Sequence, residues 1–234
     1  EQNRIVLLED AAHALGANYN GRPLGTFGTL AAFSFHERKN ITCGEGGALI
    51  INDPAMVDRA HTARNKGTNR RAFNRGEVAF YTWVESGSSY VLSDILAAFL
   101  LPQLKEIDAI TERRRSLIAN YQELLSPLEE RGLIELPHPA HPEQSSAHIY
   151  YVLLDSAETR KRLRDYLLQR EIVTLSHYEP LHLSPFVNEH WGLQPSLPVT
   201  ESIAARLLRL PLFHSLEAAQ QQQVAESIRR FFSA

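Results

Sequence analysis

The most informative segment of the sequence lies at residues 34–47, which read SFHERKNITCGEGG. An apolar run at residues 30–35 leads into it, and another apolar run follows at residues 47–51. Short apolar runs bounded by glycine and polar residues are typical of buried strands. Polar side chains at the ends of such strands gather where α/β sheets bind ligands. The pattern therefore predicts an α/β domain with a functional site at this edge of its sheet.

Lys39 is the residue of this segment with the most distinctive chemistry. A lysine becomes a nucleophile when burial or a neighbouring cation favours its neutral form, and Arg38 is such a cation. Most lysines are nevertheless solvated surface groups, and the glycine-rich end of the segment also suits an ordinary hairpin turn. The segment alone leaves a catalytic and a purely structural interpretation open.

Asp10 follows the first apolar run of the chain, which covers residues 5–8. Its side chain can cap a helix over the helix-favouring residues 11–17. Alternatively, its carboxylate can pair with a cationic ring nitrogen, as a pyridoxal cofactor requires when it withdraws electrons. Both roles fit a single geometry, so Asp10 is a second candidate site residue.

The segments that follow predict helices separated by an irregular stretch. Asp53 and Pro54 have the residue types of an N-cap and a first helical position, and they predict a helix that runs to about residue 65. Residues 66–90 are rich in glycine, asparagine, arginine, serine and aromatic residues, which predicts a long irregular loop that is either functional or disordered. A further helix is expected to begin at residues 93–101.

Beyond residue 101 the pattern predicts a long helix and then a second domain. Pro102 is expected to kink or restart the helix, which continues as an amphipathic helix to residue 132. The later elements expected are strands at residues 149–154 and 172–177 and helices at residues 158–170, 200–208 and 216–232. The predicted division is the remainder of a large domain at residues 1–103, a connecting helix at 104–132 and a small α+β domain at 133–234.

Composition limits the functional classes. The 234 residues are 44% hydrophobic and carry a formal net charge of −3, so no basic field favours nucleic acid. No apolar run approaches the ~20 residues of a membrane span, no signal peptide is recognised, and the single cysteine, Cys43, suits a reducing cytoplasm. His177 and His182 lack a third ligand at useful spacing, so we expect no metal site. The apolar run at residues 5–8 needs neighbouring strands, so we expect N-terminal elements to be missing.

Five motifs in the same order resemble the DegT-like family of sugar aminotransferases, which are pyridoxal-phosphate enzymes of fold type I. The motifs are EDAAH at residues 9–13, SFHxxK at 34–39 with GEGG at 44–47, GSSYVLSD at 87–94 with Ala97 and Ala98, HYxPLH at 177–182, and LPLF at 210–213. The resemblance covers essentially the whole chain. It implies part of the pyridoxal-phosphate-binding large domain, with a mixed sheet flanked by helices, followed by a smaller α+β domain.

The resemblance also implies roles for individual residues. Lys39 would form the imine that holds the pyridoxal 5'-phosphate and would later move the reacting proton, while Asp10 would keep the ring nitrogen protonated. The other implied contacts are His13 with the ring oxygen, Ser34 with the phosphate, Ser89 with the phosphate of the partner subunit, and Lys66, Arg70 and His182 with the sugar nucleotide. His13 stands where a glutamine is commoner, Ser89 where many relatives carry an asparagine, and Leu96 where a glutamine is usual.

Two shorter motifs narrow the resemblance. KGTNR at residues 66–70 and YTW at residues 81–83 are similar to the branch that makes dTDP-4-amino-4,6-dideoxygalactose for enterobacterial common antigen. This similarity implies transfer of an amino group from L-glutamate to the 4-keto carbon of dTDP-4-dehydro-6-deoxy-D-glucose. It further implies a cytoplasmic homodimer whose active site is shared across the interface.

Two other interpretations compete with this one. Some relatives use the same cofactor for dehydration, but they carry a histidine at the lysine position, so Lys39 argues against that reaction. The second is a truncated, catalytically weak member that acts only as a binding or structural remnant. It is favoured by the expected lack of the N-terminal segment, which in the family supplies the phosphate-cradling turn and the residue stacked on the cofactor ring.

Overall fold

The computed structural model describes residues 5–141, 144–192 and 195–233. The chain separates into two compact units. The first comprises the residues up to Thr111 together with Gln144–Ser146, and the second comprises the other residues from Glu112 onward. Helix α4 (Ile107–Glu130) contributes residues to both units. Each unit has its own hydrophobic core, so we describe the two separately.

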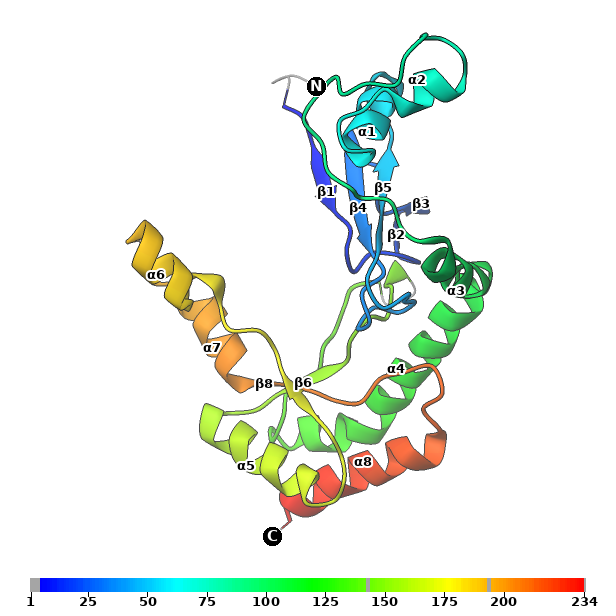
Figure 1. Ribbon diagram of the computed structural model, residues 1–234. Coiled ribbons are helices and arrows are strands. Elements are labelled where there is room, and N and C mark those ends of the chain that lie inside the picture. Colours follow the sequence, from blue (N-terminus) through cyan, green and yellow to red (C-terminus); the bar gives the residue numbers. More distant parts are fainter. Residues whose placement is uncertain (1–4, 142–143, 193–194, 234) are drawn as a thin grey trace. The chain divides into compact units, whose positions relative to one another are not determined.

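A three-stranded mixed sheet forms the centre of the first unit, in the order β1-β4-β5 (Figure 1). β1 (Leu8–Asp10) pairs parallel with β4 (Leu30–Ser34), and β4 pairs antiparallel with β5 (Gly47–Ile51). The strands expected at residues 30–35 and 47–51 are confirmed. The first strand lies a few residues later than its apolar run, because pairing with β4 begins at Leu8. A short hairpin of β2 (Asn18–Tyr19) and β3 (Arg22–Pro23) separates β1 from β4.

The helix expected at residues 11–17 is wrong, because these residues form consecutive turns. Ala14 and Ala17 donate their backbone N–H groups to carbonyls three residues earlier rather than four. Gly16 has φ +82°, and a Cβ placed on it would lie 2.6 Å from Oγ1 of Thr111. A helix over these few residues would form too few hydrogen bonds to be stable, and the left-handed backbone of Gly16 would end it there.

The helices of the first unit follow the sheet. Asp53 accepts the backbone N–H of Ala55 at 2.9 Å, which confirms it as a cap. The elements after it are η1 (Pro54–Met56), α1 (Val57–Arg64), α2 (Arg70–Asn74) and α3 (Asp94–Lys105). The interruption expected at Pro102 occurs instead at Glu106, between α3 and α4. A proline lacks the backbone N–H that a helix needs, and its ring crowds the preceding turn. Helix α3 nevertheless continues through Pro102 to Lys105.

The core of the first unit supports the connection between β4 and β5. Phe35, Ile41, Cys43 and Leu100 are buried together, and Leu15, Leu92 and Leu96 are among the partly buried side chains packed against them. Three of the four buried residues belong to the 35–46 connection itself. This loop is therefore anchored by its own apolar side chains on both sides of Lys39.

The second unit contains an antiparallel sheet in the order β6-β8-β7. Its strands are β6 (Tyr151–Leu153), β8 (Leu207–Arg209) and β7 (Leu175–Ser176). Its further helices are α5 (Ala157–Leu168), η3 (Leu181–Leu183), α6 (Pro185–Trp191), α7 (Pro198–Arg206) and α8 (Ala218–Phe231). The sequence interpretation missed β8, assigned its residues to a helix, and left α6 within a loop. The predicted mixture of strands and helices is otherwise present.

A large apolar core holds the second unit together. Tyr121 of α4 and Tyr150 stack with ring centroids 5.1 Å apart, and both are almost fully buried. Arg114 is also buried, and its guanidinium donates to the carbonyls of Ala147 at 2.8 Å and His148 at 2.7 Å. No helix in the described part of the chain combines the length and apolarity that a bilayer crossing requires.

Candidate active site

The register of the first sheet brings the principal candidates to one edge. Asp10 lies opposite Ala32 at the carboxyl end of β1, and Ser34 ends the neighbouring parallel strand β4. Ser34 is itself paired with Gly47, so the connection that contains Lys39 begins and ends at this edge. Because carboxyl ends of parallel strands meet at the same side of a sheet, the three candidates share one rim.

Asp10 has a structural role at this rim. Its Oδ1 accepts the backbone N–H of Ala12 at 3.1 Å, while the N–H of Ala11 is donated to the carbonyl of Ala32 at 3.0 Å. The carboxylate therefore caps the turn that follows β1. The Asp10 side chain is otherwise exposed and has acceptor capacity left for a cationic group.

The Lys39 connection is held by backbone hydrogen bonds. Phe35 donates to the carbonyl of Gly46 at 2.8 Å, and Cys43 donates to the carbonyl of Phe35 at 3.0 Å. Lys39 donates its backbone N–H to the carbonyl of His36 at 3.0 Å, and its side chain is half-buried. The turn is therefore ordered by the main chain, which leaves the Lys39 ammonium free of any need to stabilise the fold.

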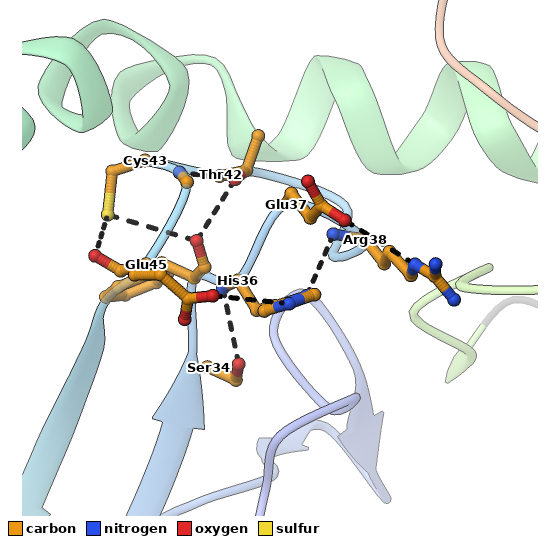
Figure 2. Close-up of polar contacts among 9 residues, drawn as sticks. Ser34, His36, Glu37, Arg38, Thr42, Cys43 and Glu45 are labelled. Carbon is orange, nitrogen blue, oxygen red and sulfur yellow. Dashed lines mark hydrogen bonds and ion pairs between the residues drawn. The ribbon is translucent and has the colours of Figure 1, made fainter.

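Side chains of the same connection also bond with one another (Figure 2). The Oγ of Ser34 accepts the backbone N–H of His36 at 3.3 Å, and Nε2 of His36 lies 3.5 Å from Oε1 of Glu45. A hydroxyl that accepts one hydrogen bond keeps its own proton to donate. Ser34 can therefore still offer a donor to an anionic group at the rim.

Two supporting contacts were missed by sequence reasoning. The Gln103 side chain of α3 accepts the N–H of Thr42 at 3.0 Å and donates to the Thr42 carbonyl at 2.8 Å. The Glu9 carboxylate accepts N–H groups from the 25–28 loop, and the bond from Gly28 is the main reason that the pKa of Glu9 is below its usual value. Local sequence motifs do not predict these contacts, because each of them joins residues that are distant in sequence.

Lys66 and Ser89 lie together in the first unit, and Arg70 follows Lys66 along the chain, in α2. An isolated β-bridge pairs Asn65 with Ser89, and the backbone N–H of Lys66 is donated to the carbonyl of Ser88 at 3.1 Å. Arg70 is the first residue of α2 and is exposed. Within the described residues, no hydrogen bond or ion pair joins this group to the Lys39 connection. The structure thus brings Asp10, Ser34 and Lys39 together and leaves Lys66 and Ser89 as their own cluster.

The remaining candidates have well-defined local partners. His13 lies in the turn after β1, with an exposed side chain. His182 belongs to the second unit, where its nearly buried ring lies with Nε2 3.0 Å from Oε1 of Glu201. The N–H of Leu197 and this contact to His182 lower the pKa of Glu201. Among the described residues, no group of three or more histidine, cysteine, aspartate and glutamate side chains is placed to hold a metal ion.

The donor set at the rim fits a pyridoxal phosphate. A primary amine, a carboxylate and a hydroxyl are the groups that such a cofactor needs for its aldehyde, its ring nitrogen and its phosphate, respectively. Lys39, Asp10 and Ser34 supply these three groups from adjoining strand ends. Lys39 would hold the aldehyde, Asp10 the ring nitrogen and Ser34 the phosphate.

Comparison with known proteins agrees with this chemistry. Residues 1–229 match the sequence profile of the DegT/DnrJ/EryC1/StrS aminotransferase family. The chain is 35% identical, over 233 residues, to a dTDP-3-amino-3,4,6-trideoxy-alpha-D-glucose transaminase from Streptomyces venezuelae, covering 99% of this chain and 58% of that protein. The expected resemblance to DegT-like aminotransferases is therefore confirmed, and the chain spans less than two thirds of this relative's length.

Solved structures show the same fold. DesV of S. venezuelae, crystallised in complex with a ketimine intermediate, superimposes with a TM-score of 0.85 and 34% identity, covering 100% of this chain and 59% of DesV. The PLP-form of the putative sugar aminotransferase Spr1654 from Streptococcus pneumoniae gives a TM-score of 0.80 and 26% identity, covering 99% of this chain and 58% of that one. These similarities confirm the predicted fold type I architecture.

Proposed function

We propose that this chain, which belongs to the DegT/DnrJ/EryC1/StrS aminotransferase family, carries the cofactor lysine of a nucleotide-sugar aminotransferase. Enzymes of this family use pyridoxal phosphate. The observation that carries the proposal is the register of β1, β4 and β5, which gathers Asp10, Ser34 and the Lys39 connection at one rim. Family membership and the donor groups at this rim both support the same reaction.

The chain's own residues divide the work of amino transfer. The bound cofactor supplies an electron sink for the C–H bond that must be broken. Lys39 would hold the cofactor through its side-chain amine, and its free amine would act as the general base that takes the proton from the α-carbon of the amino donor. Asp10 favours the protonated ring nitrogen through its negative charge. Ser34 donates to the phosphate, and His13 contacts the ring oxygen.

We assign the substrates more finely from the motifs at residues 66–70 and 81–83. The amino donor is L-glutamate, and the acceptor is the 4-keto carbon of dTDP-4-dehydro-6-deoxy-D-glucose, which gives dTDP-4-amino-4,6-dideoxygalactose for enterobacterial common antigen. Lys66, Arg70 and His182 contact the sugar nucleotide. The S. venezuelae relative is named for a sugar aminated at carbon 3. The carbon that receives the amino group therefore distinguishes the proposed reaction from that of this relative.

The activity test uses the full-length protein with added pyridoxal phosphate. We expect a visible absorbance band that disappears in Lys39→Ala and persists in Lys105→Ala, which removes an exposed lysine at the end of α3. With L-glutamate and dTDP-4-dehydro-6-deoxy-D-glucose, mass spectrometry and NMR should show a 4-amino product. A protein without any Lys39-dependent band would instead be the binding or structural remnant. A band with amination only of 3-keto sugars would overturn the finer assignment.

We further propose a cytoplasmic homodimer in which Ser89 of one subunit serves the phosphate held by the other. The separation of the Lys66 and Ser89 cluster from the Lys39 connection supports this division. Mixing inactive Lys39→Ala with inactive Ser89→Asp subunits should restore about a quarter of the activity, because random exchange leaves one intact site in each mixed dimer. Absence of any recovery after verified subunit exchange would contradict the shared site.

A further inference from the structure

A buried serine far along the chain bonds to both segments that carry the candidate site. Ser146 is 8% exposed, and its hydroxyl donates to the carbonyl of His13 at 2.7 Å. Its own carbonyl accepts the side-chain amide of Asn40, the residue after Lys39, at 2.6 Å. Ser146 lies 133 residues from His13 and 106 residues from Asn40 in the sequence. One residue therefore joins the turn after β1 to the Lys39 connection.

The short segment around Ser146 is built into the first unit. Gln144–Ser146 group with that unit rather than with the residues on either side. Oε1 of Gln144 accepts the backbone N–H of Asn20, in the turn of the β2–β3 hairpin, at 3.3 Å. The segment thus contacts three stretches of the unit, at His13, Asn20 and Asn40. A chain segment held at three separated points has a fixed path, which makes it a rigid support for the two site segments.

Both segments need such support, because neither is held by regular secondary structure. The turn after β1 has consecutive i→i−3 turns in place of a helix, so it does not have the continuous i→i−4 hydrogen bonds that hold a helix rigid. Asn40 lies where the Lys39 connection turns back towards Ile41 and Cys43, which are buried. The bonds of Ser146 fix Asp10 and Lys39 indirectly, through the backbone carbonyl of His13 on one side and the side-chain amide of Asn40 on the other.

We propose that Ser146 is a positioning residue that couples the His13 turn to the Lys39 connection. The effect of this coupling on turnover rests on the proposed function. The coupling between the two segments does not. Small displacements of a reacting group are costly to a reaction that needs aligned atoms. Loss of the Ser146 hydroxyl should therefore disturb the orientation of the Lys39 amine while leaving the residues that touch the substrate unchanged.

The first experiment measures the coupling without reference to activity. Hydrogen–deuterium exchange is followed in the full-length protein for peptides that cover residues 11–16 and 36–44. Asn40→Ala removes the side-chain amide that donates to the Ser146 carbonyl and leaves the Ser146 bond to His13 in place. Exchange at residues 11–16 should nevertheless rise about threefold or more, because their support at Ser146 is loosened. Ser146→Ala removes the hydroxyl bond to His13 and keeps the carbonyl that accepts the Asn40 amide. Exchange should rise directly at residues 11–16 and, through the coupling, at residues 36–44 as well. Unchanged exchange at residues 11–16 in Asn40→Ala would overturn the coupling.

The second experiment measures the consequence for the lysine. The visible absorbance of the cofactor-loaded protein is titrated with pH, and kcat and KM for the amino donor are determined. Ser146→Ala should shift the midpoint of that titration and lower kcat about tenfold with little change in KM, since alignment rather than binding is lost. A wild-type midpoint together with wild-type kcat would overturn the positioning role.

Ser227→Ala is the matched control. Ser227 is 7% exposed, and its hydroxyl donates to the carbonyl of Gln223 at 2.8 Å within α8. Like Ser146→Ala, Ser227→Ala therefore removes a buried hydrogen bond from a serine hydroxyl to a backbone carbonyl, but outside the candidate site. Its titration midpoint and kcat should equal those of the wild type. If the wild-type protein lacks a Lys39-dependent band, the proposed function fails, while the exchange experiment still decides whether Ser146 couples the two segments.

Discussion

The Glu9 carboxylate accepts the backbone N–H of Gly28 through Oε1 at 2.6 Å. The same oxygen accepts the N–H of Phe27 at 2.6 Å, and Oε2 accepts that of Gly25 at 2.8 Å. Glu9 precedes Asp10 in β1, and the 25–28 loop leads into β4. One carboxylate therefore fastens the loop between two parallel strands whose ends carry the candidate site.

These bonds make the stability of the protein depend on pH through Glu9. The pKa of Glu9 is lowered in the folded protein, mainly by the hydrogen bond from the Gly28 N–H. The N–H groups of Gly25 and Phe27 and the charge of Arg22 lower it further. A lowered carboxylate pKa contributes stability above its unfolded value, near pH 4.5, that is lost as the pH falls through the folded value. Glu9→Gln should lower Tm at pH 7, and its deficit should shrink in acid below pH 4.5.

The control for this measurement is Glu77→Gln, which removes an exposed carboxylate 3.6 Å from Arg75. Exposed pairs of this kind contribute little to stability. Thermal unfolding from pH 3 to pH 8 should therefore give a Tm for Glu77→Gln close to that of the wild type throughout. A Glu9→Gln deficit that stays constant over this range would show that the charge of Glu9 is not responsible.

Asp10→Asn separates the structural role of Asp10 from its proposed chemical role. An asparagine keeps the side-chain oxygen that accepts the Ala12 N–H, so the cap and the Tm should be preserved. It loses the negative charge that favours a protonated cofactor ring, so kcat should fall about 100-fold or more while cofactor still binds. Near-wild-type kcat would sink the proposed role, and Asp10→Ala provides the comparison in which the cap is lost as well.

Local patterns predicted the two strands on either side of the Lys39 connection, because these strands are close in sequence. The strands around residues 34–47 needed only apolar runs and a glycine-rich turn between them, and their register then placed Ser34 beside the Lys39 connection. Asp53 was recognised as a cap because its partner, Ala55, is two residues away. Where an interaction spans a few residues, residue types and spacing are sufficient to predict it.

Distant partners explain what the sequence did not reveal. Leu207 and Leu208 continue a helical pattern, and they become a strand because β6 and β7 pair with them from far along the chain. Ser146 belongs to no motif, and its importance appears only when His13 and Asn40 are both found at hydrogen-bond distance. The substrate-side roles of Lys66, Arg70 and His182 also depend on a partner outside the local pattern, the sugar nucleotide, and they remain predictions.

Gly67 should tolerate no side chain, although an otherwise similar glycine should. Gly67 has φ +71°, and a Cβ on it would overlap the carbonyl oxygen of Glu85. Gly76 has φ +73° with nothing within 4 Å of such an atom. Gly76→Ala should therefore cost about 1 kcal/mol for the left-handed backbone, and Gly67→Ala about 2 kcal/mol or more beyond that because of the clash.

Urea unfolding of the two alanine variants measures this difference. The clash in Gly67→Ala involves backbone, which a side-chain rotation cannot relieve, so the segment that holds Lys66 and Ser89 together should open. Protection of the Lys66 amide, which is bonded to the carbonyl of Ser88, should fall in Gly67→Ala and persist in Gly76→Ala. Equal free energies of unfolding for the two variants would contradict the predicted clash.

His177 should make the folded protein less stable in mild acid. Burial, with the nearby charge of Arg209, lowers the pKa of His177 below its ordinary value of 6.5. Below pH 6.5 the His177 side chain is protonated in the unfolded chain but stays neutral in the folded protein. The free energy of unfolding therefore has its full value above pH 6.5 and declines as the pH falls below 6.5. His177→Phe removes this dependence, so its free energy of unfolding should change less than that of the wild type between pH 7.5 and pH 5.

The same substitution should be tolerated at high pH. Nδ1 of His177 is buried without a hydrogen-bond partner among the described residues, so a phenyl ring leaves no donor or acceptor unsatisfied. The ring also keeps a packing surface for Tyr178, whose centroid lies 5.4 Å from that of His177. At pH 8 His177→Phe should match or exceed wild-type stability, and the exposed His214→Phe should retain the wild-type slope. A slope unchanged by His177→Phe would assign the acid sensitivity to another histidine.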